Sequence, residues 1–480
     1  MGNDDLAVKI NQLKKGLIDD LKDFIQIRSV YDTADLTPVK AAADWCQQKL
    51  TDRTFNLEHV RVEQKNIGDV TKNAPLIHAT CGPDGDTADL PTVLLYAHYD
   101  VVKAGEWGEQ AWHPEFVEND TRLQGRGAAD DKSGVMMHIG ALRAFEGKPP
   151  VPLKIVLEGE EEYGDTLDGY VLDPKNKDLF TADVIVIADS GNQELGQPTF
   201  TTSLRGAVAV DVTVSTLQKP KHSGVYGGPA PDAFMALVRI IAALVDDKGD
   251  VTVPDLVREH WAGEEPTEAH FREEAGVLPG VHLIGSDTLG SRLYDRPSVN
   301  VVALSGPPTY KDGAVNQLTA TAKARVSLRT APLEKPEEAI AKLKRFIRRP
   351  ELNPWNATIT VDTVDTAPGF QADTTGHGYA LAKQAMEHAY PGKRTLLTGD
   401  GGTIPLISEL QQINPGATVL VIGCQEPLCN IHSSPESVNL GEFAAMTLAE
   451  CYLLRNVSLP RSEQPAGLEA MGPTAVPVAP

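Results

Sequence analysis

Three short, mostly apolar runs constrain the fold of this chain more than any other feature. They are Thr92–Ala97, Leu153–Leu157 and Val184–Ala188. Runs of this length with little polar alternation predict strands that are buried on both faces, as in parallel sheets. Helical patterns alternate with the strand-like runs, so we expect an α/β domain of three layers, in which a mostly parallel or mixed sheet lies between helices.

The elements around these runs follow the same alternation. Apolar residues at steps of three and four predict an N-terminal helix from Leu6 to Ile25, and a second helix is expected to begin at Thr37. The other expected elements of this domain are strands Phe55–Val62, Leu76–Thr80 and Ala417–Ile422 and helices Ser133–Phe145, Tyr379–Ala389 and Phe443–Leu454.

The pattern changes between residues 204 and 365. Strands are expected there at 207–216, 299–304, 318–328 and 357–364, and helices at 232–244 and 334–347. Their order, β-α-β-β-α-β, is that of a ferredoxin-like α+β domain. We therefore expect a main domain in two parts, residues 1–203 and 366–457, an inserted domain at 204–365, and an extended Pro- and Ala-rich tail at 458–480.

Composition excludes several classes of partner. A formal net charge of −22 disfavours binding to nucleic acid or to an anionic membrane surface. No apolar run approaches the roughly 20 residues of a membrane span, and the N-terminal residues lack the apolar core of a signal peptide, so a cytoplasmic location is expected. The five cysteines are odd in number and form no CxxC pair, which predicts free thiols.

Side chains that bind metals follow the predicted strands directly. His98 and Asp189 each come just after an apolar run, and in such sheets ligands bind at the carboxyl ends of the strands. Imidazole nitrogen and carboxylate oxygen are ligands that zinc prefers. Asp100 lies two residues after His98, so on an extended segment it could orient the imidazole ring. Taken alone, His98 could equally be an ordinary core or surface histidine.

Two acidic segments complete the pattern. GRGAADDKSG, Gly125–Gly134, places Asp130 and Asp131 side by side, and adjacent carboxylates repel unless a cation lies near them. LEGEEEYG, Leu157–Gly164, has four acids at the end of a buried strand, which suits metal binding together with a general base. A capped helix start and a solvated charged loop remain the structural alternatives for these two segments. His432, in LCNIHSSPES, would be ordinary by itself.

Seven motifs in this order resemble those of the M20 family of co-catalytic zinc peptidases, including its carnosinase-like dipeptidases of the cytosolic nonspecific type. They are AHYDVV, GRGAADDKSG, EGEEEYG, ADS, HSGVYGG, GGTIP and IHSSPES, and the resemblance extends to about Leu454. It implies two divalent metal ions, Zn²⁺ first and Mn²⁺ or Co²⁺ as alternatives. The ligands implied are His98 and Asp189 for one ion, Glu162 and His432 for the other, and Asp130 as the bridge.

The resemblance also implies roles around the metals. Asp100 would orient His98, and Glu161 would be the general base. The inserted domain would be a lid and dimerisation domain, whose His222 acts in the site of the partner subunit; an ordinary loop histidine is the alternative. Residues implied around the C-terminal end of the substrate are Asn316, Arg329, Gly402 and Thr403.

Four features bear on these assignments. The additional acid Glu160 leaves a register shift of one position open, and carnosinase-like members commonly have threonine where this chain has Asn316. Arg329 could also be an unremarkable surface arginine. Position 189 is an aspartate. The dipeptidases and aminopeptidases of the family also have aspartate there, whereas its carboxypeptidases and desuccinylases more often have glutamate, so the resemblance favours a dipeptidase.

The expected function is hydrolysis of dipeptides, or of similar short substrates with a free carboxylate, by a homodimer. An N-acyl-amino-acid deacylase or a short-chain carboxypeptidase of the same family is the nearest alternative. A catalytically silent binding or assembly protein is the alternative from a different class.

Overall fold

The computed structural model describes residues 3–164, 167, 169–311, 313–402 and 404–459. The chain divides into two compact units. Within the described residues, the first unit comprises 3–202, 372–398 and 406–459, and the second comprises 203–371 and 399–405.

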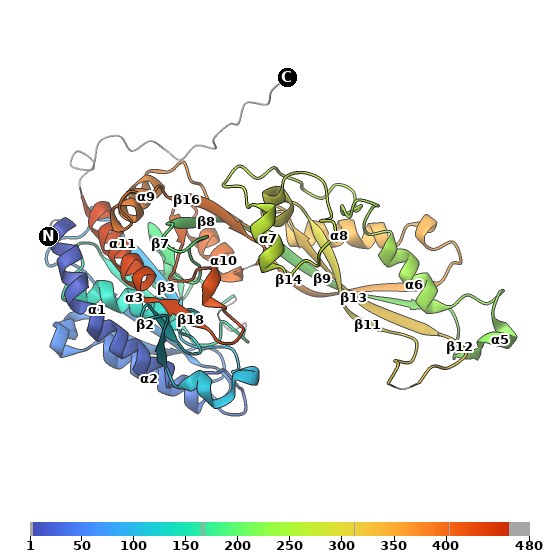
Figure 1. The fold of residues 1–480 in the computed structure, drawn as a ribbon, viewed down its shortest axis with the longest axis horizontal. Helices are drawn as coiled ribbons and strands as arrows, with labels where there is room; N and C mark the ends of the chain where they lie inside the picture. The colour runs from blue at the N-terminus through green and yellow to red at the C-terminus, as the bar shows by residue number, and fades with distance from the viewer. Residues whose placement is uncertain (1–2, 165–166, 168, 312, 403, 460–480) are drawn as a thin grey trace, which may run out of the picture. The chain divides into compact units, whose positions relative to one another are not determined.

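The first unit is built on one large mixed sheet (Figure 1). The strands of this sheet are β1 (Arg61–Asn66), β2 (Pro75–Cys81), β3 (Val93–His98), β6 (Leu153–Glu158), β7 (Val184–Ile187), β8 (Thr199–Leu204), β15 (Phe370–Gln371), β16 (Leu396–Asp400) and β17 (Thr418–Val421). Of these, β15 and the end of β8 with which it pairs, Ser203 and Leu204, belong to the second unit. The strand order is β1-β2-β6-β3-β7-β17-β8-β15, with β16 paired to β8. β6, β3, β7 and β17 are parallel, whereas β2 and β8 pair antiparallel with their neighbours β6 and β17. The sheet is thus mixed, as the fold prediction allows.

Helices flank this sheet. They are α1 (Asn3–Ile25), α2 (Thr37–Leu50), α3 (Lys132–Ala144), α4 (Lys177–Phe180), α9 (His377–Ala389), α10 (Pro405–Ile413) and α11 (Leu440–Ser458). All residues of β3 and α3 are buried, so this strand and this helix lie at the centre of the core. Each buried Leu, Ile or Val side chain contributes about 1.5–3 kcal/mol to folding. The predicted three-layer α/β class is confirmed.

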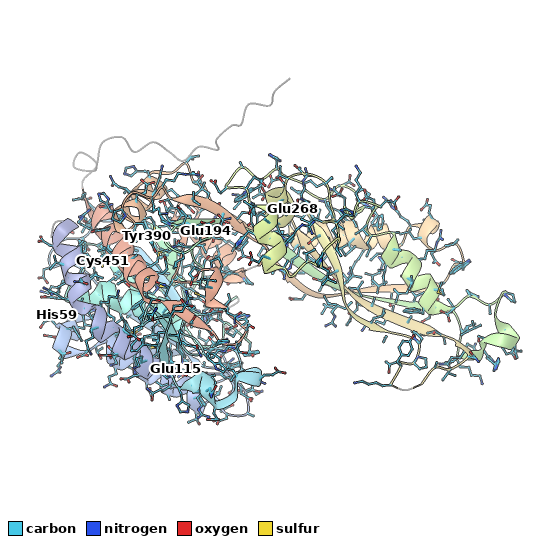
Figure 2. The ribbon with its side chains drawn as sticks, in the orientation of Figure 1. His59, Glu115, Glu194, Glu268, Tyr390 and Cys451 are labelled. Carbon is cyan, nitrogen blue, oxygen red and sulfur yellow. The ribbon has the colours of Figure 1, made fainter. Side chains whose placement is uncertain are left out.

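Polar contacts also hold the helical layer. Tyr390, labelled in Figure 2, follows α9 and donates a hydrogen bond of 2.7 Å to Glu442 at the start of α11. Cys451 of α11, also labelled there, is buried, and all five cysteines are free thiols, as expected. No described helix is both long enough and apolar enough to cross a membrane.

The predicted strand Phe55–Val62 is wrong in its position. Two 3₁₀ turns, Arg53–Phe55 and Leu57–His59, occupy most of it, and β1 begins only at Arg61. The side chain of Asp52 accepts a hydrogen bond from the backbone of Thr54, and Asn56 has a left-handed φ of 58°. These local contacts form turns in place of a strand, because the short polar side chains of Asp and Asn hydrogen-bond to nearby backbone groups and tolerate the left-handed conformation.

A small sheet joins two segments that lie far apart in the sequence. β18 (Ser437–Asn439) pairs with β5 (Arg122–Gln124), which pairs with β4 (Glu115–Val117). The other short turns of the first unit are the 3₁₀ helices Gly105–Trp112 and Pro427–Cys429. This sheet brings the residues that precede Asp130 beside those that follow His432.

The second unit contains the ferredoxin-like fold. Its elements are β9 (Gly206–Ser215), α6 (Ala233–Ala242), β11 (Ser298–Ser305), β13 (Thr321–Thr330), α8 (Pro336–Ile347) and β14 (Thr358–Ala367). The sheet order is β11-β13-β9-β14 and each pair is antiparallel. Smaller elements of this unit are β10 (Lys221–His222), α5 (Ser223–Tyr226), α7 (Glu268–Glu274), the π-helical turn Ser291–Asp295, β12 (Gln317–Leu318) and the 3₁₀ helix Pro350–Leu352.

Candidate metal centre

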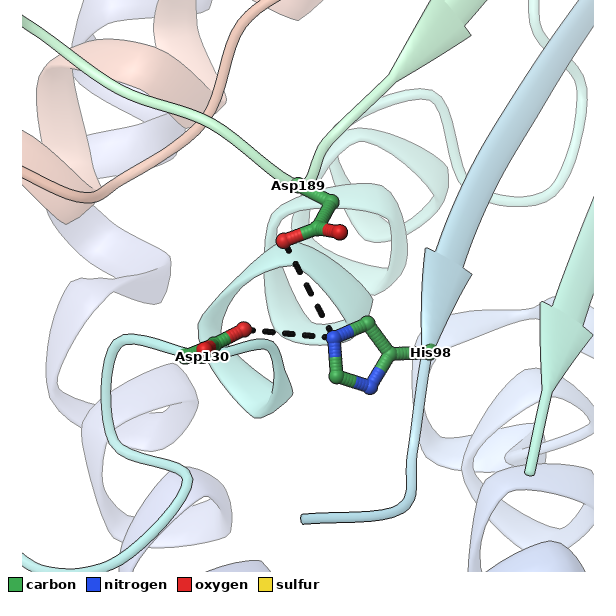
Figure 3. Close-up of side chains that lie close together, drawn as sticks. All are labelled: His98, Asp130 and Asp189. Atoms are coloured by element: carbon green, nitrogen blue, oxygen red, sulfur yellow. Dashed lines mark hydrogen bonds and ion pairs between the residues drawn. The ribbon is translucent and has the colours of Figure 1, made fainter. Parts of the chain in front are cut away.

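His98 ends β3 and is fully buried. Its Nε2 lies 3.2 Å from Asp130 Oδ1 and 3.9 Å from Asp189 Oδ1, so both carboxylates approach the same ring nitrogen (Figure 3). The other nitrogen, Nδ1, lies 3.2 Å from the backbone oxygen of Asp100 and 3.4 Å from its carboxylate. Both ring nitrogens thus face oxygen atoms. If a cation bound Nε2 between Asp130 and Asp189, the ring would keep its proton on Nδ1, where Asp100 accepts it.

A second group of ligand type lies beside the first. His432 Nε2 is 3.0 Å from Asp130 Oδ2 and 3.1 Å from Glu162 Oε2. The ligand atoms within each group of three residues lie within 4.8 Å of one another. Asp130 belongs to both groups and turns one carboxylate oxygen to each. This arrangement fits two divalent ions that share one bridging carboxylate.

The charges of these residues are poorly balanced without cations. Burial raises the pKa of Asp189 to about 7, although the charge of His98 opposes the shift. Hydrogen bonds to Asp130 and Glu162 raise the pKa of His432 to about 10. Oε1 of Glu162 is buried without a hydrogen-bond partner among the described residues. Divalent cations would neutralise these crowded carboxylates and provide a partner for the unpaired oxygen of Glu162. The nitrogen and oxygen donors suit zinc, manganese or cobalt.

Asp100 is buried behind His98 and contacts two predicted site residues. Its carboxylate accepts hydrogen bonds from the backbone amides of Glu161 (3.2 Å) and Glu162 (3.1 Å). Asp100 therefore orients the His98 ring and also fixes the segment that follows β6. Sequence reasoning anticipated only the first of these contacts.

The three consecutive glutamates after β6 have different surroundings. Glu160 accepts hydrogen bonds from the backbone amide of Ala74 and from the Asn73 side chain, at 3.1 Å for the latter. Burial raises the pKa of Glu161 well above its usual range. The nearby charge of Asp189 raises this pKa further, and the charge of His98 opposes the shift. Glu162 therefore belongs to a ligand group, Glu161 lies near Asp189 and His98 without belonging to either group, and Glu160 anchors the loop.

The Gly-rich turn before α3 holds its acids by tight packing. Asp131 is buried and its Oδ2 accepts a hydrogen bond of 3.1 Å from the backbone amide of His98. A Cβ at Gly134 would lie 2.2 Å from Asp131 Oδ1, so only glycine fits there. Asp131 thus supports the strand end and is not a member of either ligand group in the described residues.

Glu436 is a residue of this centre that sequence reasoning missed. It is fully buried and accepts hydrogen bonds from the backbone amides of Gly127, Ala129 and Asp130. Its position four residues after His432, within the motif IHSSPES, was the available signal.

The other predicted site residues lie in the second unit. His222 is exposed, and its Nδ1 accepts a hydrogen bond of 3.1 Å from the backbone amide of Gly224. The backbone oxygen of Asn316 accepts from Ser223 at 3.0 Å, which places Asn316 near His222. Arg329 lies in β13 opposite Ser298, and the amide of Gly402 donates to Asp400 at 2.7 Å. Thr403 lies outside the described residues.

Comparison with known proteins identifies the family. Residues 94–456 match Peptidase family M20/M25/M40. The chain belongs to this family. It is 37% identical over 396 residues to the cysteinylglycine-S-conjugate dipeptidase of Corynebacterium striatum, covering 80% of this chain and 86% of that protein. It is 25% identical to the Cys-Gly metallodipeptidase dug1 of Schizosaccharomyces pombe, covering 92% of this chain and 96% of that one.

Solved structures agree with the fold. The dipeptidase Dug1p of Saccharomyces cerevisiae aligns with a TM-score of 0.75 at 21% identity and covers 95% of this chain and 98% of its own. Human carnosine dipeptidase 1 also has a TM-score of 0.75, at 22% identity, covering 95% of this chain and 99% of its own. The predicted family is confirmed. As an M20 member the chain is a metallopeptidase, and the two relatives named above are dipeptidases.

Proposed function

We propose that this metallopeptidase is a dinuclear, zinc-dependent dipeptidase that cleaves dipeptides with a free C-terminal carboxylate. The single observation that carries the proposal is Asp130, whose two carboxylate oxygens face separate groups, His98 with Asp189 and Glu162 with His432. When bound, two divalent ions would supply the Lewis acidity that activates a water molecule and polarises the scissile carbonyl.

Glu161 is the proposed general base. It directly precedes Glu162, its backbone is fixed by Asp100, and it belongs to neither group of metal ligands. A carboxylate in this position can accept the proton of the attacking water and later deliver the same proton to the nitrogen of the leaving amine. His98 would keep its Nδ1 proton throughout, because the backbone and side chain of Asp100 accept from that nitrogen.

Substrate recognition is assigned to the second unit. The fork of the Arg329 guanidinium suits a free carboxylate in two hydrogen bonds. Asn316, Gly402 and Thr403 are proposed around the same end of the substrate, and His222 of the partner subunit would stabilise the oxyanion of the tetrahedral intermediate. The names of the relatives, which specify Cys-Gly and β-Ala-His dipeptides, support substrates with a free carboxylate.

A substrate panel tests this proposal. The purified protein, reconstituted separately with Zn²⁺, Mn²⁺ and Co²⁺, would be offered Cys-Gly, β-Ala-His and other free dipeptides beside tripeptides and N-acylated amino acids. We expect turnover of free dipeptides that far exceeds turnover of the acylated set. Turnover of N-acylated amino acids alone would identify a deacylase. Release of the C-terminal residue from tripeptides, in preference to cleavage of dipeptides, would identify a carboxypeptidase. Fewer than one ion per chain with no activity would support a silent binding protein.

Three finer predictions belong to the same proposal. The catalytic domain would consist of residues 1–203 and 366–457, with the inserted domain at 204–365 between them. A homodimer would form through the inserted domain, and the protein would be cytoplasmic, which the five free thiols support.

A further inference from the structure

The buried carboxylate of Glu436 is committed to the segment that carries Asp130. Oε2 accepts hydrogen bonds from Arg126 Nη1 (2.8 Å) and from the amide of Gly127 (3.0 Å). Oε1 accepts from the amides of Ala129 (2.9 Å) and Asp130 (3.1 Å). One side chain therefore fixes three amides of this turn, the last of which belongs to the bridging residue itself.

Arg126 connects the same turn to the other ligand segment. Its Nη2 donates a hydrogen bond of 2.8 Å to the backbone oxygen of Ser433, the residue after His432. Both Arg126 and Glu436 are buried, and the Trp107 ring lies 5.9 Å from the guanidinium. We call this buried ion pair the Arg126–Glu436 clasp. It holds the segment of Asp130 and the segment of His432 to each other.

Stability alone does not explain this clasp. Burying an ion pair costs desolvation free energy that apolar residues of the same size avoid. Glu436 also lies near the negative charge of Asp130, which adds a further electrostatic cost. The hydrogen bonds of the pair are directed at backbone groups next to two proposed metal ligands, so its effect is to set their separation.

We propose that Glu436 and Arg126 are positioning residues of the metal centre, which fix the distance between Asp130 and His432 at the value that the second ion requires. This inference rests on the proposed two-metal function. Groups that orient metal ligands from behind affect metal affinity by about 10-fold to 100-fold when they are replaced.

The test compares Glu436→Gln with a matched control. Glutamine keeps the size of the side chain but replaces one acceptor oxygen by an NH₂ group, which then meets N–H donors. The control is Glu334→Gln in the second unit, where Glu334 is also buried and accepts from Lys342 Nζ (2.7 Å) and the amide of Val257 (2.6 Å). Metal-free proteins would be titrated with Zn²⁺ against a chromophoric chelator, and their melting temperatures would be measured in parallel.

We expect Glu436→Gln to bind one of two Zn²⁺ ions about 10-fold to 100-fold more weakly than the unmodified protein. Glu334→Gln should lose thermal stability and keep both affinities. Unchanged affinity for both ions in Glu436→Gln would overturn the inference, even if the variant melts at a lower temperature, because the clasp would then be only structural.

If Glu436→Gln does not fold, a second variant tests the inference. Arg126→Lys keeps the charge but cannot reach both Glu436 and the Ser433 oxygen with a planar fork, so it should weaken the same ion. Wild-type affinity for both ions in Arg126→Lys would overturn the inference. Metal content and dipeptide turnover of the unmodified protein test the proposed function separately. If that function is wrong, the unmodified protein itself binds fewer than two ions or does not cleave dipeptides.

Discussion

Glu160, Glu161 and Glu162 follow one another in the chain and yet meet different partners. Glu160 holds Ala74, Glu162 faces His432, and Glu161 lies near Asp189 and His98 without belonging to a ligand group. The three identical side chains point to different partners because of the conformation of the turn after β6. Asp100 fixes this turn by accepting hydrogen bonds from the backbone amides of Glu161 and Glu162.

Glu161→Gln should therefore remove proton transfer and leave metal binding intact. We expect kcat to fall by about 100-fold to 10,000-fold, the usual contribution of a general base. Bound metal, measured by elemental analysis after gel filtration, should remain at the wild-type level. Glu160→Gln is the control and should keep most of its turnover, because glutamine can still accept the hydrogen bond from Ala74. If the two phenotypes are exchanged, the assigned register is wrong by one residue.

Asp295 gives a prediction of pH dependence away from the metal centre. It is buried in the second unit, and burial raises its pKa to about 6, while Ser203 donates a hydrogen bond to its carboxylate. The folded state therefore holds a proton more tightly than the unfolded state. The free energy of unfolding therefore falls as the pH rises between about 4 and 6, because the unfolded state gives up this proton first. The loss is absent below pH 4 and complete above pH 6.

Asp295→Asn removes the charge and keeps an oxygen for Ser203. We expect the free energy of unfolding to rise by about 1–2 kcal/mol at pH 7.5, less than the full shift would give because solvent screens part of the effect. Thermal melts from pH 5 to pH 8 would check this. A variant that is no more stable than wild type at pH 7.5 would contradict the assigned pKa.

At the scale of elements, the start of α3 is defined by the contact between Gly134 and Asp131. Gly134→Ala would place its Cβ 2.2 Å from Asp131 Oδ1. We expect a loss of about 1–3 kcal/mol, typical of overpacking, together with weaker metal binding, because Asp131 also holds the His98 amide.

Gly16→Ala in α1 is the matched control, since nothing lies within 4 Å of its new Cβ. It should stabilise the protein by about 0.5–1 kcal/mol through helix propensity. Denaturant unfolding would measure both variants. Equal stability of the two alanine variants would show that the α3 turn can relax around the added methyl group.

In the first unit, the sequence predicted the buried strands whose side chains are mostly apolar and missed β8, whose side chains are mostly polar. β3, β6, β7 and β17 were expected because their side chains are mostly Leu, Ile and Val. β8, with the sequence TFTTSL, is completely buried, but its threonines and serine conceal this burial until its pairing with β17 and β16 is known.

The candidate site shows the same division. Its ligand residues stand out as His, Asp and Glu at strand ends, and the family resemblance assigned them roles. The double contact of Asp100 and the clasp of Glu436 could not be predicted, because each depends on amides that only tertiary structure brings together. Glu436 is 306 positions away from Asp130, whose amide it binds.

At the scale of the whole molecule, the proposed metal ligands and the proposed substrate-binding residues belong to different units. The ligand groups belong to the first unit, and His222 and Arg329 belong to the second. Val225 is 70% exposed and Tyr226 is 47% exposed, and both lie in α5, three and four residues after His222. Exposed apolar side chains beside a proposed catalytic histidine fit a contact surface for a second copy of the chain.

Complementation between two inactive variants would test this shared site. His222→Ala and Arg329→Ala should each lose most turnover. If His222 acts in the partner's site and Arg329 in its own, a mixed dimer has one intact site and one doubly altered site. Random exchange in an equal mixture makes about half of the dimers mixed, so about a quarter of wild-type activity should return. Native mass spectrometry would verify the exchange, and each variant incubated alone would serve as control. Mixed dimers without recovered activity would contradict the assignment of His222 to the partner's site, because a histidine that acts within its own subunit leaves every site in the mixture damaged.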